Sequence, residues 1–202
     1  MLKVALTGGI ATGKSYVLAR LRDRGVPTID ADDVVHEALA PGTKTNSAIA
    51  LQFGNAFVEP DGSIDRKLLA LNVFGDPEQR RRLEEIVHPV VYDSIRKWFD
   101  TLRAPIGVAS IPLLYETGRE KDFEFVVVTV CPPAVQLQRL VERDRMSEEE
   151  ARRRIDAQMP AGEKAARGNF VILTGGTIQA TDRQVDELLV ELKRGSSGSQ
   201  RS

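Results

Sequence analysis

The sequence has 202 residues, enough for one large domain or for one domain that carries an insertion. Hydrophobic residues make up 42% of the chain and charged residues 28%, which is typical of a folded globular protein rather than a disordered one. The 28 basic and 29 acidic residues leave a net charge of -1. This balance excludes the overall basic excess that holds a long nucleic acid by its phosphates, so we expect no nucleic-acid partner.

The cysteine, histidine and apolar content indicates the cellular compartment in which we expect the protein. The single cysteine, Cys131, excludes an internal disulfide, and with only two histidines the chain lacks a structural zinc site. We therefore expect a reducing, cytoplasmic location. No apolar run reaches the roughly 18 residues of a membrane span, so no membrane association is expected. The small polar segment 195–202 is expected to be a flexible tail.

Five apolar, β-branched runs predict strands buried on both faces, because they lack the strict alternation of half-exposed strands. The runs are Leu2–Thr7, Val26–Ile29, Ile106–Ile111, Phe123–Val130 and Asn169–Leu173. Amphipathic helical patterns fall between and after them, at Lys14–Arg24, at Pro133–Asp144, after the capping box Ser147-x-x-Glu150, and at Gln184–Arg194. This alternation predicts a doubly wound α/β fold with a parallel sheet.

Residues 34–100 interrupt the alternation and contain no clear parallel strand. Apolar residues recur at helical spacing between 83 and 98, and His88-Pro89 predicts a kink or a helix restart within that stripe. We interpret 34–100 as a helical insertion between the second and third strands. Such an insertion in a nucleotide-binding sheet is expected to supply the pocket for a second substrate.

The segment Gly8-Gly9-Ile10-Ala11-Thr12-Gly13-Lys14-Ser15 fits the pattern G-x-x-x-x-G-K-[ST], and it follows a predicted strand and opens a predicted helix. Glycines allow consecutive backbone N–H groups to turn toward phosphate oxygens, and a helix N-terminus adds positive charge. Lys14 is expected to reach the β- and γ-phosphates, and the Ser15 hydroxyl to ligate Mg²⁺. The alternative is a glycine-rich turn with a solvated lysine.

Two absent motifs limit the class of nucleotide-binding protein. The N-K-x-D or T-K-x-D motif that reads guanine is missing, which argues against a GTP-binding switch. The third predicted strand ends Ala109-Ser110-Ile111-Pro112, without the aspartate of a motor or transporter ATPase. An early phosphate loop followed by a helical insertion favours a small-molecule kinase.

Acidic residues follow the second predicted strand, in Thr28-Ile29-Asp30-Ala31-Asp32-Asp33. A carboxylate at that edge of a sheet can accept the proton of an attacking hydroxyl or bind Mg²⁺ through water. We expect Asp30 and Asp32 to have different roles, with Asp32 catalytic. Helix N-capping is the alternative, and we expect it mainly of Asp30.

The chain resembles the dephospho-coenzyme A kinase family over about residues 2–194. The resemblance rests on the phosphate loop and on the order and spacing of the segments IDADDV, FG, DGSIDR, LEEIVHP, IPLLYE, QLQRLVERD and ARRRIDAQ. It implies phosphorylation of the ribose 3′-hydroxyl of dephospho-coenzyme A by ATP with Mg²⁺, on a five-stranded parallel sheet of order 2-3-1-4-5. The alternative is another small P-loop kinase, acting on a nucleoside, a sugar acid or shikimate.

The resemblance also implies a division of the chain and a set of site residues. The nucleotide-binding core is expected at 1–33, 101–138 and 168–194, the coenzyme A domain at 34–100 and a lid at 139–167. ATP is expected to bind Gly9, Ile10, Ala11, Thr12, Gly13, Lys14, Ser15, Tyr16 and Arg143, with Ser15 on Mg²⁺. Catalytic roles fall on Asp32, Lys14 and Arg139, and the acceptor is expected to contact Asp32, Asp65, Arg66, His88, Leu113 and Glu116.

Structural alternatives stay open for several of these residues. Asp65 and Arg66 can form a turn and helix cap, and His88 can be an ordinary histidine beside a proline. Leu113 can be core and Glu116 a cap. Arg139 and Arg143 share a helix face at i, i+4, either facing the triphosphate or forming a solvated face with ion pairs.

Two positions depart from the family pattern. Leu173-Thr174-Gly175-Gly176 lacks the asparagine that the family usually carries near adenine, so ATP preference is expected to be less strict. Tyr16 replaces a small hydroxyl residue.

Overall fold

The computed structural model describes residues 1–198, which divide into two compact units. The first unit combines Met1–Ile29 with the chain from Leu102 onward, and the second is Asp30–Thr101. Residues 30–33 therefore group with the second unit and not with the predicted core. The reason is that helix α2 (Ala31–Ala38) begins at once and packs against helix α5 (Pro77–Thr101) of that unit.

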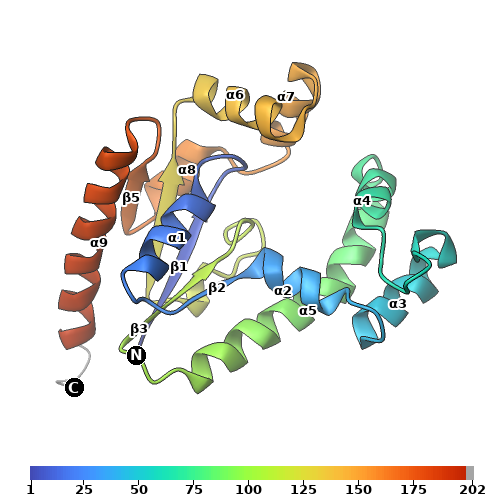
Figure 1. The fold of residues 1–202 in the computed structure, drawn as a ribbon, viewed down its shortest axis with the longest axis horizontal. Coiled ribbons are helices and arrows are strands. Elements are labelled where there is room, and N and C mark those ends of the chain that lie inside the picture. Colours follow the sequence, from blue (N-terminus) through green and yellow to red (C-terminus); the bar gives the residue numbers. More distant parts are fainter. Residues whose placement is uncertain (199–202) are drawn as a thin grey trace. The chain divides into compact units, whose positions relative to one another are not determined.

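The first unit is built on a five-stranded sheet of order β2-β3-β1-β4-β5 (Figure 1). The strands are β1 (Leu2–Gly8), β2 (Thr28–Asp30), β3 (Ile106–Ser110), β4 (Phe125–Val130) and β5 (Phe170–Leu173). Central strand β1 pairs in parallel on both sides, with Val4 opposite Val108 of β3 and Phe125 of β4. The predicted fold class and strand order are confirmed.

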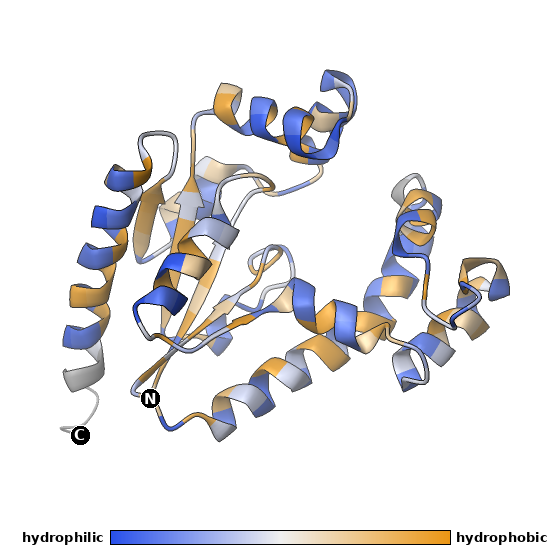
Figure 2. Ribbon diagram, viewed as in Figure 1, coloured by the Kyte–Doolittle hydropathy of each residue, from blue (hydrophilic) through white to orange (hydrophobic). Residues whose placement is uncertain are grey.

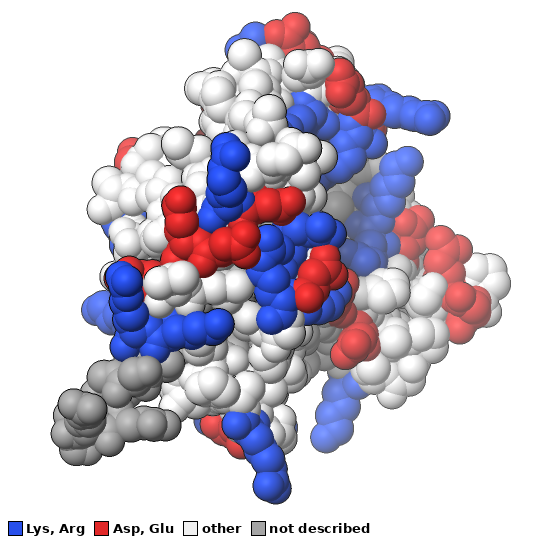
Figure 3. All heavy atoms as spheres, turned by 60° about the vertical axis from the view of Figure 1, so that its left-hand side comes forward, with Lys and Arg blue, Asp and Glu red and all other residues white. Residues whose placement is uncertain are grey.

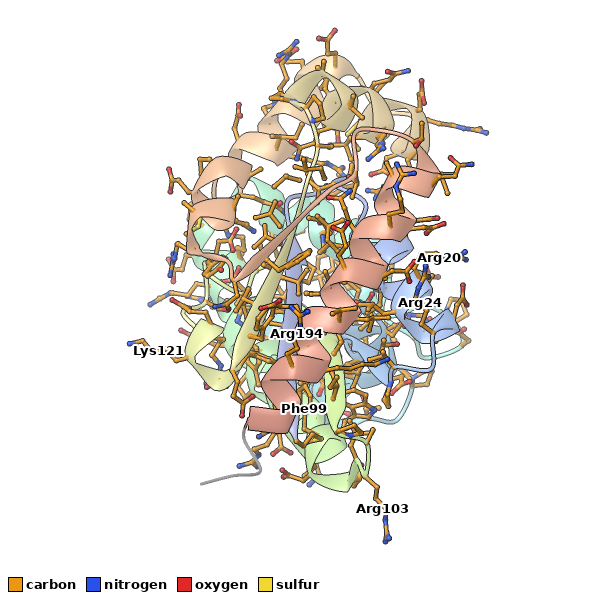
Figure 4. The ribbon with its side chains drawn as sticks, turned by 90° about the vertical axis from the view of Figure 1, so that its left-hand side faces the viewer. Arg20, Arg24, Phe99, Arg103, Lys121 and Arg194 are labelled. Atoms are coloured by element: carbon orange, nitrogen blue, oxygen red, sulfur yellow. The ribbon has the colours of Figure 1, made fainter. Side chains whose placement is uncertain are left out.

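One face of the sheet is covered by α1 (Lys14–Asp23) and α9 (Ile178–Gly198), which lies along the sheet in Figure 4. Alternate residues of β1 point into this layer, so Val4 and Leu6 are fully buried in the same core cluster as Leu21 of α1 and Leu188 of α9. Each such side chain contributes about 1.5–3 kcal/mol by leaving water. Figure 2 shows the apolar strands in orange and the solvent-facing sides of the helices in blue.

Helix α9 is longer at both ends than the predicted Gln184–Arg194. It starts early because the Thr177 hydroxyl accepts the Ala180 N–H at 3.2 Å, an N-capping bond. The expectation of a flexible tail from 195 is wrong for residues 195–198, which are helical. Gly195 lies against Leu2, where a Cβ would be 3.8 Å from the leucine Cδ2, so packing on β1 continues past Arg194. Residues 199–202 of that tail lie outside the described residues.

Three helices lie between β4 and β5 in the chain. They are α6 (Pro133–Asp144), α7 (Glu148–Asp156) and α8 (Ala161–Arg167), and α8 packs on β4. The predicted bounds of α6 are confirmed. The Ser147 hydroxyl accepts the Glu150 N–H at 3.2 Å, so the predicted cap of α7 is also present. Motion of segment 139–167 as a lid stays a prediction.

The second unit is helical, as predicted for 34–100. After α2 come α3 (Lys44–Phe53), the 3₁₀ turn η1 (Asn55–Phe57), α4 (Arg66–Phe74) and α5. Val58 and Ile64 form an isolated antiparallel bridge, and no longer strand pairing occurs within residues 34–100 as described. Helix α5 runs through Pro89 without a restart, because the proline lies on the exposed side while Val87 and Val91 are buried.

The surface carries both signs of charge. On the face seen in Figure 3, basic and acidic side chains lie next to one another over the helices. Among the described residues, the model contains no helix that is both long and apolar enough to cross a lipid bilayer.

Candidate active site

The loop between β1 and α1 has a backbone that only glycine permits at its two ends. A Cβ on Gly8 would lie 2.3 Å from the Thr129 Oγ1, and Gly13 has a φ of 90° with Thr174 atoms 3.1 Å from such a Cβ. Ala11 adopts a φ of 57°, the left-handed region that costs an ordinary residue about 1 kcal/mol or more. This is the tight turn predicted for the G-x-x-x-x-G-K-[ST] pattern.

Hydrogen bonds among three threonines fix the loop to the ends of two strands. The buried Thr12 hydroxyl donates to the Gly9 carbonyl at 2.8 Å and lies 2.8 Å from the Thr129 hydroxyl of β4. The Thr174 hydroxyl, just after β5, donates to the Thr12 carbonyl at 2.7 Å. The loop is therefore fixed by two strand ends that are more than 100 residues distant in sequence.

The cationic and hydroxyl groups of the motif lie at the start of α1. The Lys14 Nζ is 3.3 Å from the Gly8 carbonyl oxygen and 3.4 Å from that of Gly9, and Ser15 is exposed in the next position. Gly13 is the N-cap, and the first turn contains no acidic residue. A helix N-terminus with a lysine and no nearby carboxylate in its first turn favours an anion.

Tyr16 of the motif faces away from the loop. Its hydroxyl donates to the Asp182 carboxylate of α9 at 2.8 Å, and burial raises the pKa of this phenol, with Asp182 adding to the shift. Arg20 lies over the Tyr16 ring, and Arg24 pairs with Asp186 of α9 at 2.5 Å (Figure 4). The Tyr16 side chain thus links α1 to α9, and the ATP contact of this residue stays a prediction.

The two arginines predicted to share a face of α6 have different partners. Arg139 donates to the Thr174 carbonyl at 2.6 Å and lies 3.3 Å from its hydroxyl. Arg143 donates twice to the carboxylate of the adjacent Asp144, at 2.6 and 2.9 Å, and this pairing lowers the pKa of Asp144. Arg139 is therefore connected to the phosphate loop through Thr174, which donates to the Thr12 carbonyl.

The segment after β3 contains an ion pair that sequence reasoning missed. Lys164 of α8 is fully buried, and its Nζ is 2.7 Å from the Glu116 Oε1 and 2.9 Å from the Pro112 carbonyl oxygen. The Met159 N–H donates to the same Glu116 oxygen at 3.0 Å. Leu113 is half-buried in this segment. No short motif includes Lys164, so only the tertiary structure identifies its partner.

The remaining predicted residues lie in the second unit. Asp30 caps α2 by accepting the Asp32 N–H at 3.1 Å, as expected, and Asp32 is exposed in the first turn. Asp65 caps α4 by accepting the Leu68 N–H at 2.9 Å.

Two further side chains of that unit have close neighbours. The Arg66 Nη1 lies 2.9 Å from the Nδ1 of His36, a histidine that sequence reasoning did not single out. The His88 ring contacts the Tyr92 ring edge to face at 5.9 Å. The geometry thus groups the phosphate loop, Arg139, Leu113 and Glu116 in one unit and Asp32, Asp65, Arg66 and His88 in the other.

Comparisons with known proteins agree with one another over the length of the chain. A family model described as dephospho-CoA kinase matches residues 2–180. The dephospho-CoA kinase of Anaeromyxobacter dehalogenans is 45% identical over 198 residues, which cover 96% of this chain and 94% of that protein.

Two solved structures are similar to the fold. A crystal structure from Thermus thermophilus superposes with a TM-score of 0.79 at 33% identity, covering 95% of this chain and 97% of the other. The dephospho-CoA kinase of Campylobacter jejuni gives a TM-score of 0.71 at 26% identity, covering 96% and 98%.

Proposed function

The chain belongs to the dephospho-CoA kinase family, and we propose that it transfers the γ-phosphoryl group of ATP to the ribose 3′-hydroxyl of dephospho-CoA, giving coenzyme A and ADP. The observation that carries this proposal is the phosphate loop with Lys14 at the start of α1, in a chain whose family match spans residues 2–180. The alternative of a nucleoside, sugar acid or shikimate kinase is not favoured, because relatives at 45% and 40% identity over nearly the whole chain are named dephospho-CoA kinases.

The loop residues 9–16 bind the triphosphate of ATP in this proposal. Backbone N–H groups and the Lys14 ammonium neutralise phosphate charge, and they need no reorganisation when charge develops in transfer. ATP enters as its Mg²⁺ complex. The Ser15 hydroxyl fits a magnesium ion because it is a hard oxygen donor, exposed at the first turn of α1.

Arg139 contributes a positive charge from α6. Its guanidinium is bound to Thr174, which itself donates to the loop at Thr12. In this proposal the Arg139 guanidinium exchanges its bond to the Thr174 carbonyl for a phosphate oxygen of ATP. Arg143 donates to Asp144. We assign it to ATP binding only because it lies on the same face of α6 as Arg139.

The second unit supplies most of the residues that we assign to the acceptor, and Asp32 of this unit is the general base. The 3′-hydroxyl loses its proton to the Asp32 carboxylate while its oxygen bonds to the γ-phosphorus, and the bond from that phosphorus to the β–γ bridging oxygen breaks. Asp32 is exposed, and Asp30 is engaged as the helix cap, which favours Asp32 over Asp30 for this step. Asp65, Arg66, His88, Leu113 and Glu116 are assigned to acceptor binding.

A direct assay tests the reaction. The protein is incubated with Mg-ATP and each candidate acceptor, and the product is identified by mass. We expect ADP formation to depend on dephospho-CoA and coenzyme A to appear, whereas an analogue without the 3′-hydroxyl gives no phosphorylated product. Phosphorylation of shikimate or a nucleoside in place of dephospho-CoA would contradict the proposal. We assign the reaction to the cytoplasm, consistent with one cysteine in the sequence.

A further inference from the structure

Two glutamine side chains bind the backbone of Ile10, inside the phosphate loop. The Gln136 Nε2 of α6 donates to the Ile10 carbonyl at 2.8 Å. The Gln158 Oε1, two residues past the end of α7, accepts the Ile10 N–H at 2.8 Å. The pair thus contacts both peptide groups that flank the Ile10 Cα. We call Gln136 and Gln158 the carboxamide clamp.

The clamp lies directly on the loop. A Cβ added to Gly9 would be 3.0 Å from the Gln136 Nε2 and 3.9 Å from the Gln158 Oε1, so the carboxamides occupy the space that a side chain would need. Gln136 is also buried, with 6% of its surface exposed. A buried amide that loses its partner is destabilised, which keeps this side chain directed at Ile10.

Gln158 is fixed in turn by its neighbours. Its own N–H donates to the Ile155 carbonyl at 3.1 Å, and the next residue, Met159, donates to Glu116. The Glu116 carboxylate is bound by the buried Lys164. The acceptor atom of the clamp is therefore held at a defined place by the segment after β3 and by α8.

The orientation of the loop donors depends on these two bonds. In a trans peptide the N–H points opposite to the C=O, so the bond from Gln136 to the Ile10 carbonyl also directs the Ala11 N–H to the opposite side. Ala11 has a φ of 57°, a conformation that persists only where neighbours impose it. Gln158 meanwhile accepts the Ile10 N–H, so this donor is not among the backbone N–H groups that bind the phosphates, and the predicted ATP contact of Ile10 does not use it.

We propose that Gln136 and Gln158 are positioning residues for phosphoryl transfer, which fix the Ile10–Ala11 backbone so that the Ala11 N–H faces the triphosphate. This inference rests on the proposed function, since it concerns the same loop and the same nucleotide. It predicts that the clamp affects the phosphates of the nucleotide and leaves the base, the ribose and the acceptor unchanged.

The variants Gln136→Met and Gln158→Met test this, because methionine has similar length and cannot form either hydrogen bond. We expect each to lower kcat/KM for ATP about tenfold and to leave KM for dephospho-CoA within about twofold. The inhibition constant of inorganic triphosphate rises by about the same factor as KM for ATP, and that of adenosine does not change. Both side chains bind the backbone of the same residue, Ile10. The double variant is therefore expected to lose less kcat/KM for ATP than the product of the two single losses.

Gln138→Met is the matched control. Gln138 lies on the same helix two residues away and donates to Glu142 at 2.9 Å, so its kinetics are expected to equal those of the wild type. Urea midpoints are measured for all variants. If the buried Gln136→Met fails to fold, the half-buried Gln158→Met decides.

Two outcomes would contradict the proposal that the carboxamide clamp positions the loop. One is a kcat/KM for ATP within twofold of the wild type in Gln158→Met. The other is an equal weakening of adenosine and triphosphate inhibition, which a general loss of structure produces. Failure of the proposed function is a separate result, because wild-type protein would then form no coenzyme A from Mg-ATP and dephospho-CoA.

Discussion

Replacing Lys164 by methionine removes a buried ammonium and keeps the aliphatic chain. The Lys164 side chain is fully buried, and its Nζ contacts the Glu116 Oε1 at 2.7 Å and the Pro112 carbonyl at 2.9 Å. After Lys164→Met, the Pro112 oxygen still accepts the Thr7 hydroxyl at 3.3 Å, and Glu116 still accepts the Met159 N–H. The variant therefore isolates the loss of the cation.

The size of the effect follows from this geometry. Removing one partner of a buried ion pair costs about 3–5 kcal/mol, because the other charge stays unpaired. The Glu116 side chain is 21% exposed, so water reaches the carboxylate and the lower end applies. We expect Lys164→Met to lower the free energy of unfolding by about 3 kcal/mol, which is roughly a 100-fold change in the folding equilibrium.

Urea unfolding at 25 °C, followed by circular dichroism, measures this difference. Lys121→Met is the control, since the Lys121 side chain extends outward from the fold in Figure 4 and is exposed. Adding Glu116→Leu to Lys164→Met is expected to recover at least about 1 kcal/mol, because an apolar pair leaves no unpaired charge. A loss below about 1 kcal/mol in Lys164→Met would refute the reasoning that the buried pair stabilises the fold.

Three further variants test the proposed roles in catalysis. Lys14→Ala removes the ammonium that binds the β- and γ-phosphates, so turnover is expected to fall at least about 100-fold with an unchanged urea midpoint. Near-normal turnover would contradict the assignment of residues 8–15 as the phosphate-binding loop. Arg139→Ala is expected to lower kcat far more than it weakens ATP binding measured by calorimetry, and equal losses would make Arg139 a ground-state binding residue. Asp32→Asn is expected to abolish transfer while calorimetry still detects both substrates, whereas Asp30→Asn is expected to keep both transfer and stability, because an asparagine oxygen can still accept the Asp32 N–H and cap α2; a dead Asp30→Asn beside an active Asp32→Asn would reverse the choice of base.

The sheet could be predicted because its strands are short apolar runs with little ambiguity. Differences arose at the ends of elements, where local hydrogen bonds decide. The predicted strand Phe123–Val130 begins at Phe125 in the structure, because the Phe123 N–H donates to the Glu120 carbonyl at 3.3 Å and closes the 3₁₀ turn η2 (Glu120–Asp122). His88-Pro89 predicted a kink or a restart of the helix, and the restart does not occur, because α5 continues through Pro89 with Val87 and Val91 buried.

Side-chain partners in the candidate site were less predictable than the residues themselves. The motif identified Lys14 and Ser15, because their spacing is tied to one loop. Lys164 and Gln136 were not singled out, and Gln158 was noted only as the end of the ARRRIDAQ segment, since each of the three contacts a segment at least 48 residues away in sequence. The sequence left two interpretations of Asp65 open, an acceptor contact and a helix cap. In the structure Asp65 is the N-cap of α4, and its contact with the acceptor stays a prediction.

The chain order of the first unit has a consequence for synthesis. The phosphate loop is translated long before α9, but the core beneath it needs Leu188 and Leu192 of α9, and Leu192 follows Gly8 by 184 positions. At roughly 5–20 residues per second, a ribosome takes about 10–40 s to cover that interval. Throughout this time the apolar faces of β1 and α1 lack their cover, so the nascent chain presents a binding surface for holding chaperones until α9 emerges.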